Sequence, residues 1–134
     1  MKAATFPSRD RGETSVQMVL LVPVVLSILF LTVNAAALAH AGQIASLAAN
    51  RGAQLIASSN GDSAAVSIVR VEIARTIRDL GSVLESEPQF STYDGNVEVT
   101  VRVKVPGVVP FLPGFVTRRA NAPIEQFINE QDRR

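Results

Sequence analysis

Few residues in this chain have the types and spacing that catalysis or the binding of a metal or cofactor requires. His40 with Ser46 or Ser58 would supply a base and a nucleophile, but the sequence shows no orienting acid and no oxyanion loop. Glu85 and Glu87 would suit glycoside hydrolysis, although a solvated helix end explains two neighbouring glutamates more simply. A phosphate-binding glycine loop and a metal-ligand spacing are both lacking. The sequence therefore predicts no enzyme, no cofactor and no metal site.

The composition points toward a membrane. The chain has 134 residues, which fits about one domain, and it is 47% hydrophobic but only 19% charged, with a mean hydropathy of +0.23. A net charge of +1 argues against a nucleic-acid partner, because such proteins are usually far more basic. The absence of cysteine excludes a disulfide scaffold and a thiolate zinc site. Membrane attachment, a small extracytoplasmic module, or both remain.

One segment near the N-terminus is apolar enough to span a bilayer. No Asp, Glu, Lys or Arg occurs from Thr14 to Asn50, and Val16 to Leu38 is almost continuously apolar. A helix over those 23 positions would be about 35 Å long, against about 30 Å of hydrocarbon. Pro23 predicts a local kink or loosening, because it removes one helical hydrogen bond. The sequence therefore predicts one transmembrane helix.

The basic residues indicate its orientation. Lys2, Arg9 and Arg11 precede the apolar segment, whereas only His40 follows it before Arg51. The positive-inside rule then places the N-terminus in the cytoplasm and the rest of the chain outside.

A secretory signal is the rival interpretation of the same segment. Cleavage after Ala41, in the sequence Ala39-His40-Ala41, would release a secreted small binding module. The apolar segment is longer than the usual ~7–15 residues of a signal, and helix-favouring sequence continues past Ala41.

Beyond Leu38 the helix is expected to continue out of the membrane as an amphipathic helix. Four alanines recur at a spacing of four and form a flank that another helix could approach closely: Ala41, Ala45, Ala49 and Ala53. The alternative is that alanine is simply the best helix former. Asn60-Gly61 suits the left-handed backbone of a helix end, and Asp62 or Ser63 is placed to cap the next helix.

A second helix and an antiparallel sheet are expected next. Spacings of three and four residues put six apolar side chains on one helix face: Val66, Val69, Ile73, Ile77, Leu80 and Leu84. The β-branched residues of this segment leave a strand as the alternative. Valines alternate with polar residues from Val97 to Val105, as in a half-buried strand. Asp94-Gly95 predicts a hairpin turn from a preceding strand over 89–93, and a third strand is expected over 115–122.

A proline-rich loop follows the long strand. Its apolar residues are Val108, Val109, Phe111, Leu112 and Phe115. Such side chains on an irregular loop either fold back onto the sheet or meet a partner or the membrane surface. Arg118 and Arg119 next to the loop would suit anionic headgroups or an acidic partner, unless they are only solvated.

Two segments resemble the TadE-like pseudopilins of the tight-adherence (Flp) pilus system. They are RGETSVQMVLLVP at residues 11–23 and AANRGA at residues 48–53. The resemblance implies a pilin-like α+β fold, with one long N-terminal transmembrane helix followed by a second helix and a small antiparallel sheet. It divides the chain into a cytoplasmic leader (1–12), a long helix that is transmembrane in its first half (13–59), and a small extracytoplasmic α+β module (60–134).

The resemblance also assigns processing residues. Gly12 would precede the cleavage point of a prepilin peptidase, and Glu13 would be the first mature residue. The chain departs from the family at Gln17, where a glutamate is usual. That carboxylate is taken to attract the N-terminal amine of a neighbouring subunit, and Gln17 can only form a hydrogen bond. The departure leaves open whether cleavage occurs.

The expected function is therefore structural. The resemblance implies a non-enzymatic, single-pass protein of the cell membrane that takes part in assembly or initiation of the pilus. The expected partners are other pilins or pseudopilins along the N-terminal helix, an inner-membrane assembly platform, the prepilin peptidase and the lipid bilayer, with no nucleic acid.

Overall fold

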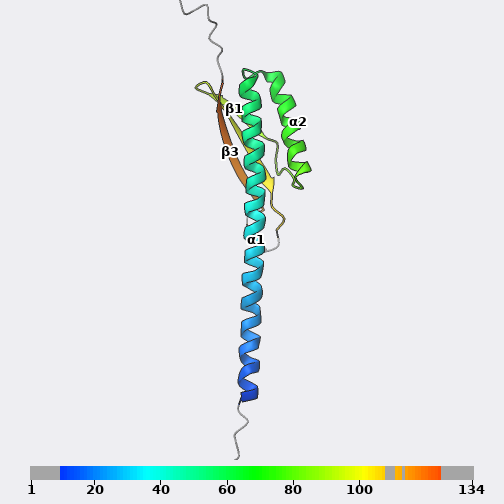
Figure 1. Ribbon diagram of the computed structural model, residues 1–134, viewed down its shortest axis with the longest axis vertical. Coiled ribbons are helices and arrows are strands. Elements are labelled where there is room, and N and C mark those ends of the chain that lie inside the picture. The colour runs from blue at the N-terminus through cyan, green and yellow to red at the C-terminus, as the bar shows by residue number, and fades with distance from the viewer. Residues whose placement is uncertain (1–9, 108–110, 113, 125–134) are drawn as a thin grey trace, which may run out of the picture.

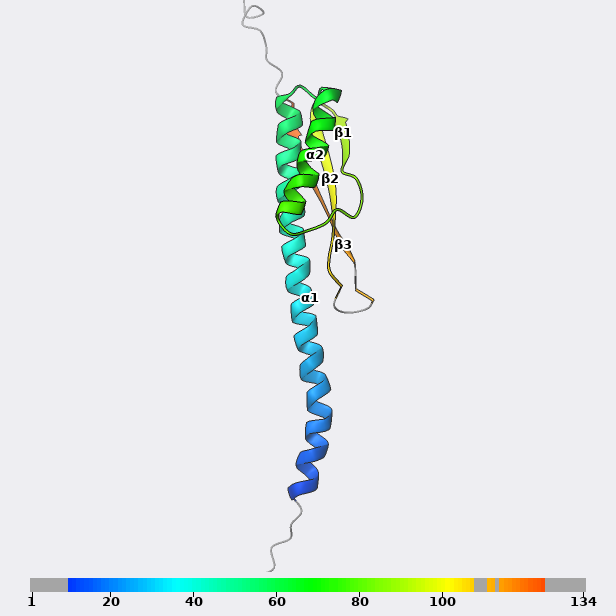
Figure 2. The same cartoon turned by 90° about the vertical axis from the view of Figure 1, so that its right-hand side faces the viewer.

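The molecule is a long helical rod with a small module packed around one end (Figure 1). The computed structural model describes residues 10–107, 111–112 and 114–124, with side chains from Ser15 onward. The described elements are α1 (Asp10–Ser58), α2 (Ser63–Asp79), β1 (Gln89–Tyr93), β2 (Asn96–Lys104) and β3 (Phe115–Pro123). Both helices lie on one face of the sheet (Figure 2). The α+β, pilin-like architecture expected from the sequence is confirmed.

Helix α1 is a single element of 49 residues. It continues through Pro23 without a break in its helical structure. The hydroxyl of Ser27 donates a hydrogen bond of 2.7 Å to the Pro23 carbonyl, and Thr32 bonds in the same way to Ile28 at 2.8 Å. Such bonds satisfy hydroxyl groups locally in a segment that has few other polar partners.

The turn between the two helices has the geometry that its sequence predicts. Asn60 and Gly61 have φ values of 55° and 71°, in the left-handed region. The amide of Gly61 donates back to the Ile56 carbonyl at 3.1 Å, which satisfies an otherwise unpaired group at the end of α1. The side chain of Asp62 then accepts from the Ala64 amide at 3.1 Å and caps α2.

Helix α2 ends earlier than its apolar spacing predicts. The amides of Gly81 and Ser82 donate to the carbonyls of Arg78 and Ile77, each at 2.9 Å, and Gly81 has a φ of 77°. Two hydrogen bonds of this kind, around a glycine with left-handed backbone conformation, terminate a helix. Leu84 therefore does not belong to the helix, and it forms a bridge with Val103 instead. The strand alternative for 69–73 is wrong, because these residues are helical.

The sheet is antiparallel, in the order β1-β2-β3. Asp94 and Gly95 form the predicted hairpin turn with φ values of 50° and 71°. Val105 lies just beyond β2, and the third strand ends at Pro123. The bounds of all three strands therefore agree closely with those expected from the sequence.

The core lies between the sheet and the helices. Four valines on one face of β2 are almost completely buried: Val97, Val99, Val101 and Val103. They share a single core with alanines of α1 and with Val69, Ile73 and Ile77 of α2. The valine face is therefore covered by both helices of the same chain.

Candidate functional site

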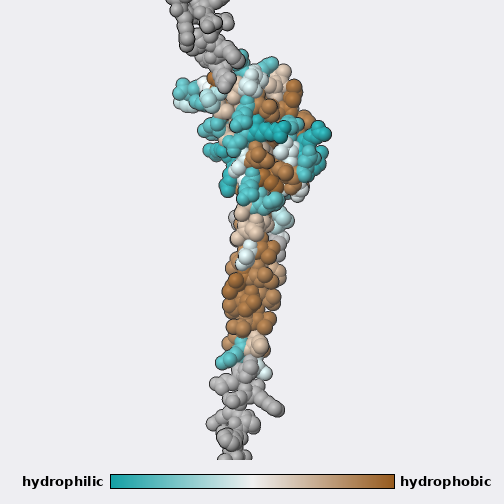
Figure 3. All heavy atoms as spheres, viewed as in Figure 1, coloured by the Kyte–Doolittle hydropathy of each residue, from teal (hydrophilic) through white to brown (hydrophobic). Residues whose placement is uncertain are grey.

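The first half of α1 presents a continuous apolar surface that the chain itself leaves uncovered. Its large side chains from Val16 to Val33 are all exposed, and they form a band around the rod (Figure 3). The helix is long and apolar enough to cross a membrane, and its most apolar window has no buried residue. An apolar area of this extent is typical of contact with lipid or with other apolar helices.

The processing residues lie at the N-terminal end of this surface. Gly12 and Glu13 are in the first turn of α1, and their side chains lie outside the described part of the chain. Gln17 follows one turn later with an exposed side chain. The structure thus places all three on one continuous helix that leads into the apolar band.

The four regularly spaced alanines of α1 occupy a different environment. Ala41, Ala45, Ala49 and Ala53 are buried in the core of the module. Two glycines extend the close packing: a Cβ on Gly42 would lie 3.0 Å from Nη2 of Arg118, and one on Gly52 would lie 2.6 Å from Cδ1 of Ile73. The small residues of α1 therefore accommodate β3 and α2 of the same chain.

The loop between β2 and β3 keeps apolar side chains exposed. Phe111 is fully exposed, and Leu112 and Phe115 are partly so; Val108 and Val109 lie outside the described residues. The guanidinium of Arg102 stacks 4.2 Å from the Phe115 ring centroid. Its Nε lies 3.7 Å from Oε2 of Glu85, and this nitrogen is buried without a hydrogen bond to any described residue.

Sequence reasoning missed Asn34. This polar residue of the apolar helix is only 3% exposed, whereas Val33 beside it is 45% exposed. Spacings of four and three residues connect Asn34 to Leu38 and Ala41, so Asn34 continues the face of α1 that packs on the sheet. This spacing was the signal in the sequence that could have identified it.

The candidate catalytic groups have other partners. Glu85 pairs with Arg102, and Glu87 pairs with Arg70 at 3.1 Å. Both glutamates are exposed, as the solvated interpretation expects, but they lie in the connection between α2 and β1 rather than at a helix end. His40 is exposed, and the Ser58 hydroxyl donates to the Leu55 carbonyl at 2.9 Å. Within the described residues, no group of three His, Asp or Glu is placed to hold a metal ion.

The comparisons with known proteins identify one match. A family model described as TadE-like protein matches residues 12–54. The resemblance to the TadE-like family is confirmed. The matched TadE-like segment includes the whole apolar band and most of the alanine face of α1, and it associates the chain with the tight-adherence pilus system. Together with the apolar helix, it supports a membrane-anchored protein. Neither a curated protein nor a solved structure matches the chain.

Proposed function

We propose that this chain is a non-enzymatic, membrane-anchored pseudopilin that takes part in assembly or initiation of a tight-adherence pilus. The observation that supports this role best is the uncovered apolar half of α1, which is continuous with a compact module. The TadE-like match over the same helix supports it independently.

Lateral association would use the first half of α1. The alanine face is occupied by the chain's own sheet and second helix, so it is not free to receive a neighbouring pilin. The large side chains nearer the N-terminus, such as Val19 and Leu20, are exposed and need lipid or other helices around them. Other pilins or pseudopilins and the inner-membrane platform are therefore proposed to contact this half.

Orientation and processing follow from the N-terminal sequence. The basic residues before α1 favour a cytoplasmic N-terminus, which puts the module outside. We propose that a prepilin peptidase cleaves after Gly12 and leaves Glu13 as the first residue. Gln17 would then offer a hydrogen bond, without an ion pair, to a neighbouring subunit.

The intact mass of the native protein tests this proposal. Loss of residues 1–12 is expected for a processed pseudopilin, and Gly12→Leu should prevent that loss. Gly107→Leu is a matched control, because Gly107 has open space around it and lies far from the leader. An unchanged mature N-terminus in Gly12→Leu would contradict the assignment of the leader.

The same measurement addresses secretion after Ala41. Ala41 is buried in the core in the middle of α1, so a peptidase would have to unwind the helix there. Loss of 41 residues from the native chain would overturn the anchored pseudopilin in favour of a released module.

A further inference from the structure

A groove opens between α2 and the edge strand β1. Its volume is about 690 Å³, within the range of about 300–1,000 Å³ that is typical of binding sites. Apolar side chains and hydroxyl groups both line it, among them Ile56, Val66, Val97, Ser91 and Thr92. The groove therefore offers a mixed surface with room for several side chains of a ligand.

The strand beside this groove has main-chain groups that point away from the sheet. Tyr93 and Asn96 flank a two-residue turn whose φ values are 50° and 71°, so they form the hydrogen-bonded pair next to the turn. Hydrogen-bonded and non-hydrogen-bonded pairs alternate along an antiparallel ladder, so the amides and carbonyls of Phe90 and Thr92 point outward from β1. Within the described residues, no main-chain hydrogen bond reaches these groups. β1 therefore presents two free donors and two free acceptors.

The two edge strands of the sheet differ in how well they are protected. β1 has the sequence QFSTY, which contains no charged residue and no proline. β3 carries Arg118 and Arg119 in its middle and Pro123 at its end. Charged side chains and proline are the usual means by which an exposed edge avoids pairing with a further strand. The unprotected edge of this sheet is therefore β1.

We propose that an extended segment of a partner polypeptide adds to β1 as a fourth strand, with alternate side chains in the groove. Main-chain hydrogen bonds then supply affinity, and the groove supplies specificity. Phe90 and Thr92 lie opposite buried valines of β2, so their side chains are on the helix side of the sheet. Cross-strand neighbours share a face. The two partner residues that bond to Phe90 and Thr92 therefore face Ile56 and Val66 and are apolar.

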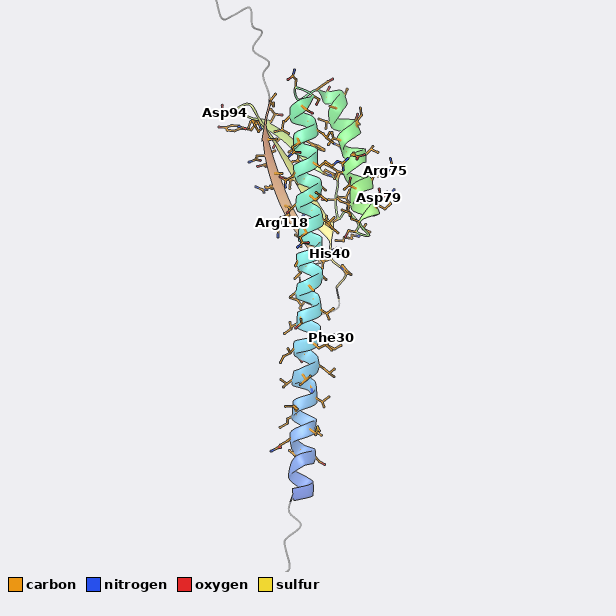
Figure 4. The ribbon with its side chains drawn as sticks, in the orientation of Figure 1. Phe30, His40, Arg75, Asp79, Asp94 and Arg118 are labelled. Carbon is orange, nitrogen blue, oxygen red and sulfur yellow. The ribbon has the colours of Figure 1, made fainter. Side chains whose placement is uncertain are left out.

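The charges around β1 favour basic residues at the ends of the partner segment. Glu87 precedes β1 with its side chain 80% exposed, and the exposed Asp94 follows the strand. The described lining of the groove has a single cation, Arg70, and Glu87 already pairs with it. Figure 4 shows Asp94 at the hairpin tip, apart from Arg75 and Arg118. A segment with a cation at each end would meet a carboxylate at each end of β1.

A second copy of this chain does not fit this edge, and in this respect the inference rests on the proposed function that α1 spans the membrane. β2 and β3 run roughly along α1 (Figures 1 and 2). Two-fold pairing of β1 with itself would therefore point the two α1 helices in opposite directions. Pairing of β1 with β3 of another copy would turn them by about 60–75°, because each strand adds a twist of about 20–25°. Spanning helices tilt by only about 20° on average.

A synthetic peptide with the proposed chemistry tests the groove. The probe is acetyl-Lys-Val-Thr-Val-Thr-Val-Lys-amide with a fluorescent label, added to the full-length chain in phospholipid nanodiscs, and binding is measured by anisotropy. Its valines would face the groove and bond to β1, so N-methylation of the valines should weaken binding about tenfold or more. N-methylation of the threonines, whose amides would point away, is the matched control and should leave binding unchanged. Replacing both lysines by glutamate should weaken it.

The other outcomes of this titration are also decisive. Equal affinity of the two methylated peptides would overturn the added strand, because main-chain bonding would not be involved. Absence of binding by the parent peptide would overturn it as well. Retention of the chain in membranes after alkaline extraction is measured on the same preparation. Loss of the chain from membranes would contradict the proposed function, whatever the peptide does.

Amide hydrogen exchange locates the peptide on the chain. Saturating peptide should slow exchange at Phe90 and Thr92 about tenfold or more, because these amides gain an acceptor. Thr117 and Arg119 on β3 should exchange at the same rate with and without peptide. Protection on β3, or on neither edge, would contradict a strand added to β1.

Two proline variants test the edge from the side of the protein. Thr92→Pro removes an outward amide of β1, so it should abolish peptide binding and leave the melting temperature nearly unchanged. Asn121→Pro is the matched control, because Asn121 lies opposite Glu98, which bonds toward β1, and its own amide also points outward. Unchanged binding by Thr92→Pro would overturn the inference, and unfolding of this variant would show that the Thr92 amide is not free.

A cysteine variant tests whether a second copy occupies the edge instead. The chain contains no cysteine, so a single introduced thiol can react only with another copy. Thr92→Cys in vesicles should stay monomeric under mild oxidation. Disulfide-linked dimers would show that β1 pairs with itself, which would replace the partner segment by a second copy.

Discussion

The two halves of α1 are both rich in apolar residues, but they have opposite surroundings. Residues 16–33 carry large apolar side chains, and all of these remain exposed. Residues 41–57 carry mainly alanine and glycine on the face that packs against the sheet and α2, and that face is buried. On the packing face, small side chains mark the half that receives its own sheet, and polar residues such as Gln43 and Arg51 occupy the exposed side of that half. The difference teaches that one helix can serve as both anchor and core.

Truncation in the second half should have the largest effect. Ile56 is 2% exposed in the core, whereas its neighbour Leu55 is 40% exposed. Ile56→Ala should lower the free energy of unfolding of the module by about 2–5 kcal/mol, because it leaves a cavity. Thermal melts in mild detergent, followed by circular dichroism, should show a shift of about 4–8 °C per kcal/mol. Equal shifts in Ile56→Ala and in the control Leu55→Ala would contradict this location of the core.

A charge in the first half should instead affect membrane insertion. Leu26→Arg should disfavour insertion by about 2.5–3.5 kcal/mol, because Leu26 lies near the middle of the apolar segment. The measurement is the fraction of full-length chain that stays with membranes after alkaline extraction. Leu47→Arg makes the same change at an exposed leucine of the second half and should leave that fraction unchanged. Equal losses from both variants would remove the distinction between the halves.

Enlarging an alanine should affect only the second half. Ala49 is completely buried, so Ala49→Leu should force the sheet away from α1 and cost about 1–3 kcal/mol of module stability. Gln54→Leu adds a leucine to the exposed side of the same helix and should have little effect on the melting temperature. A stable Ala49→Leu module would show that the close approach of helix and sheet is not required.

The smallest effect is expected at the joint between the helices. Asp62→Ala removes the cap of α2 and should cost about 1 kcal/mol, with no change in membrane insertion. Asp62→Asn keeps an acceptor oxygen and should retain most of the stability. If the alanine and asparagine variants had the same melting temperature, the capping hydrogen bond would not be the reason for the loss of stability.

Much of the fold could be predicted from the sequence, because the local sequence patterns and the packing of the core favour the same helices and strands. The valine alternation of β2 requires one covered face, and Asp94-Gly95 suits a tight hairpin turn, so both strands follow from the sequence. The early end of α2 was less visible, because Leu84 continues the apolar spacing beyond the helix. The left-handed Gly81 determines the end point, and Leu84 then joins the sheet through Val103.

The candidate site was only partly predictable. The apolar segment and the exposed loop follow from composition, since both consist of side chains that water does not favour. The element that packs on the alanine face cannot be predicted from composition, because Ala45 and Ala49 permit close approach by either a helix or a sheet. The burial of Asn34 continues the buried face of α1 at spacings of four and three residues, but the surrounding apolar segment hides this periodicity in the sequence.

The uninterrupted course of α1 has a mechanical consequence. Its 49 residues correspond to about 74 Å of continuous helix, and one end of that length is built into the hydrophobic core. The helix is continuous between its two ends. Pulling, tilting or turning the N-terminal half therefore moves the whole module with it. If α1 is embedded in lipid as proposed, a force that extracts the helix is delivered directly to the module.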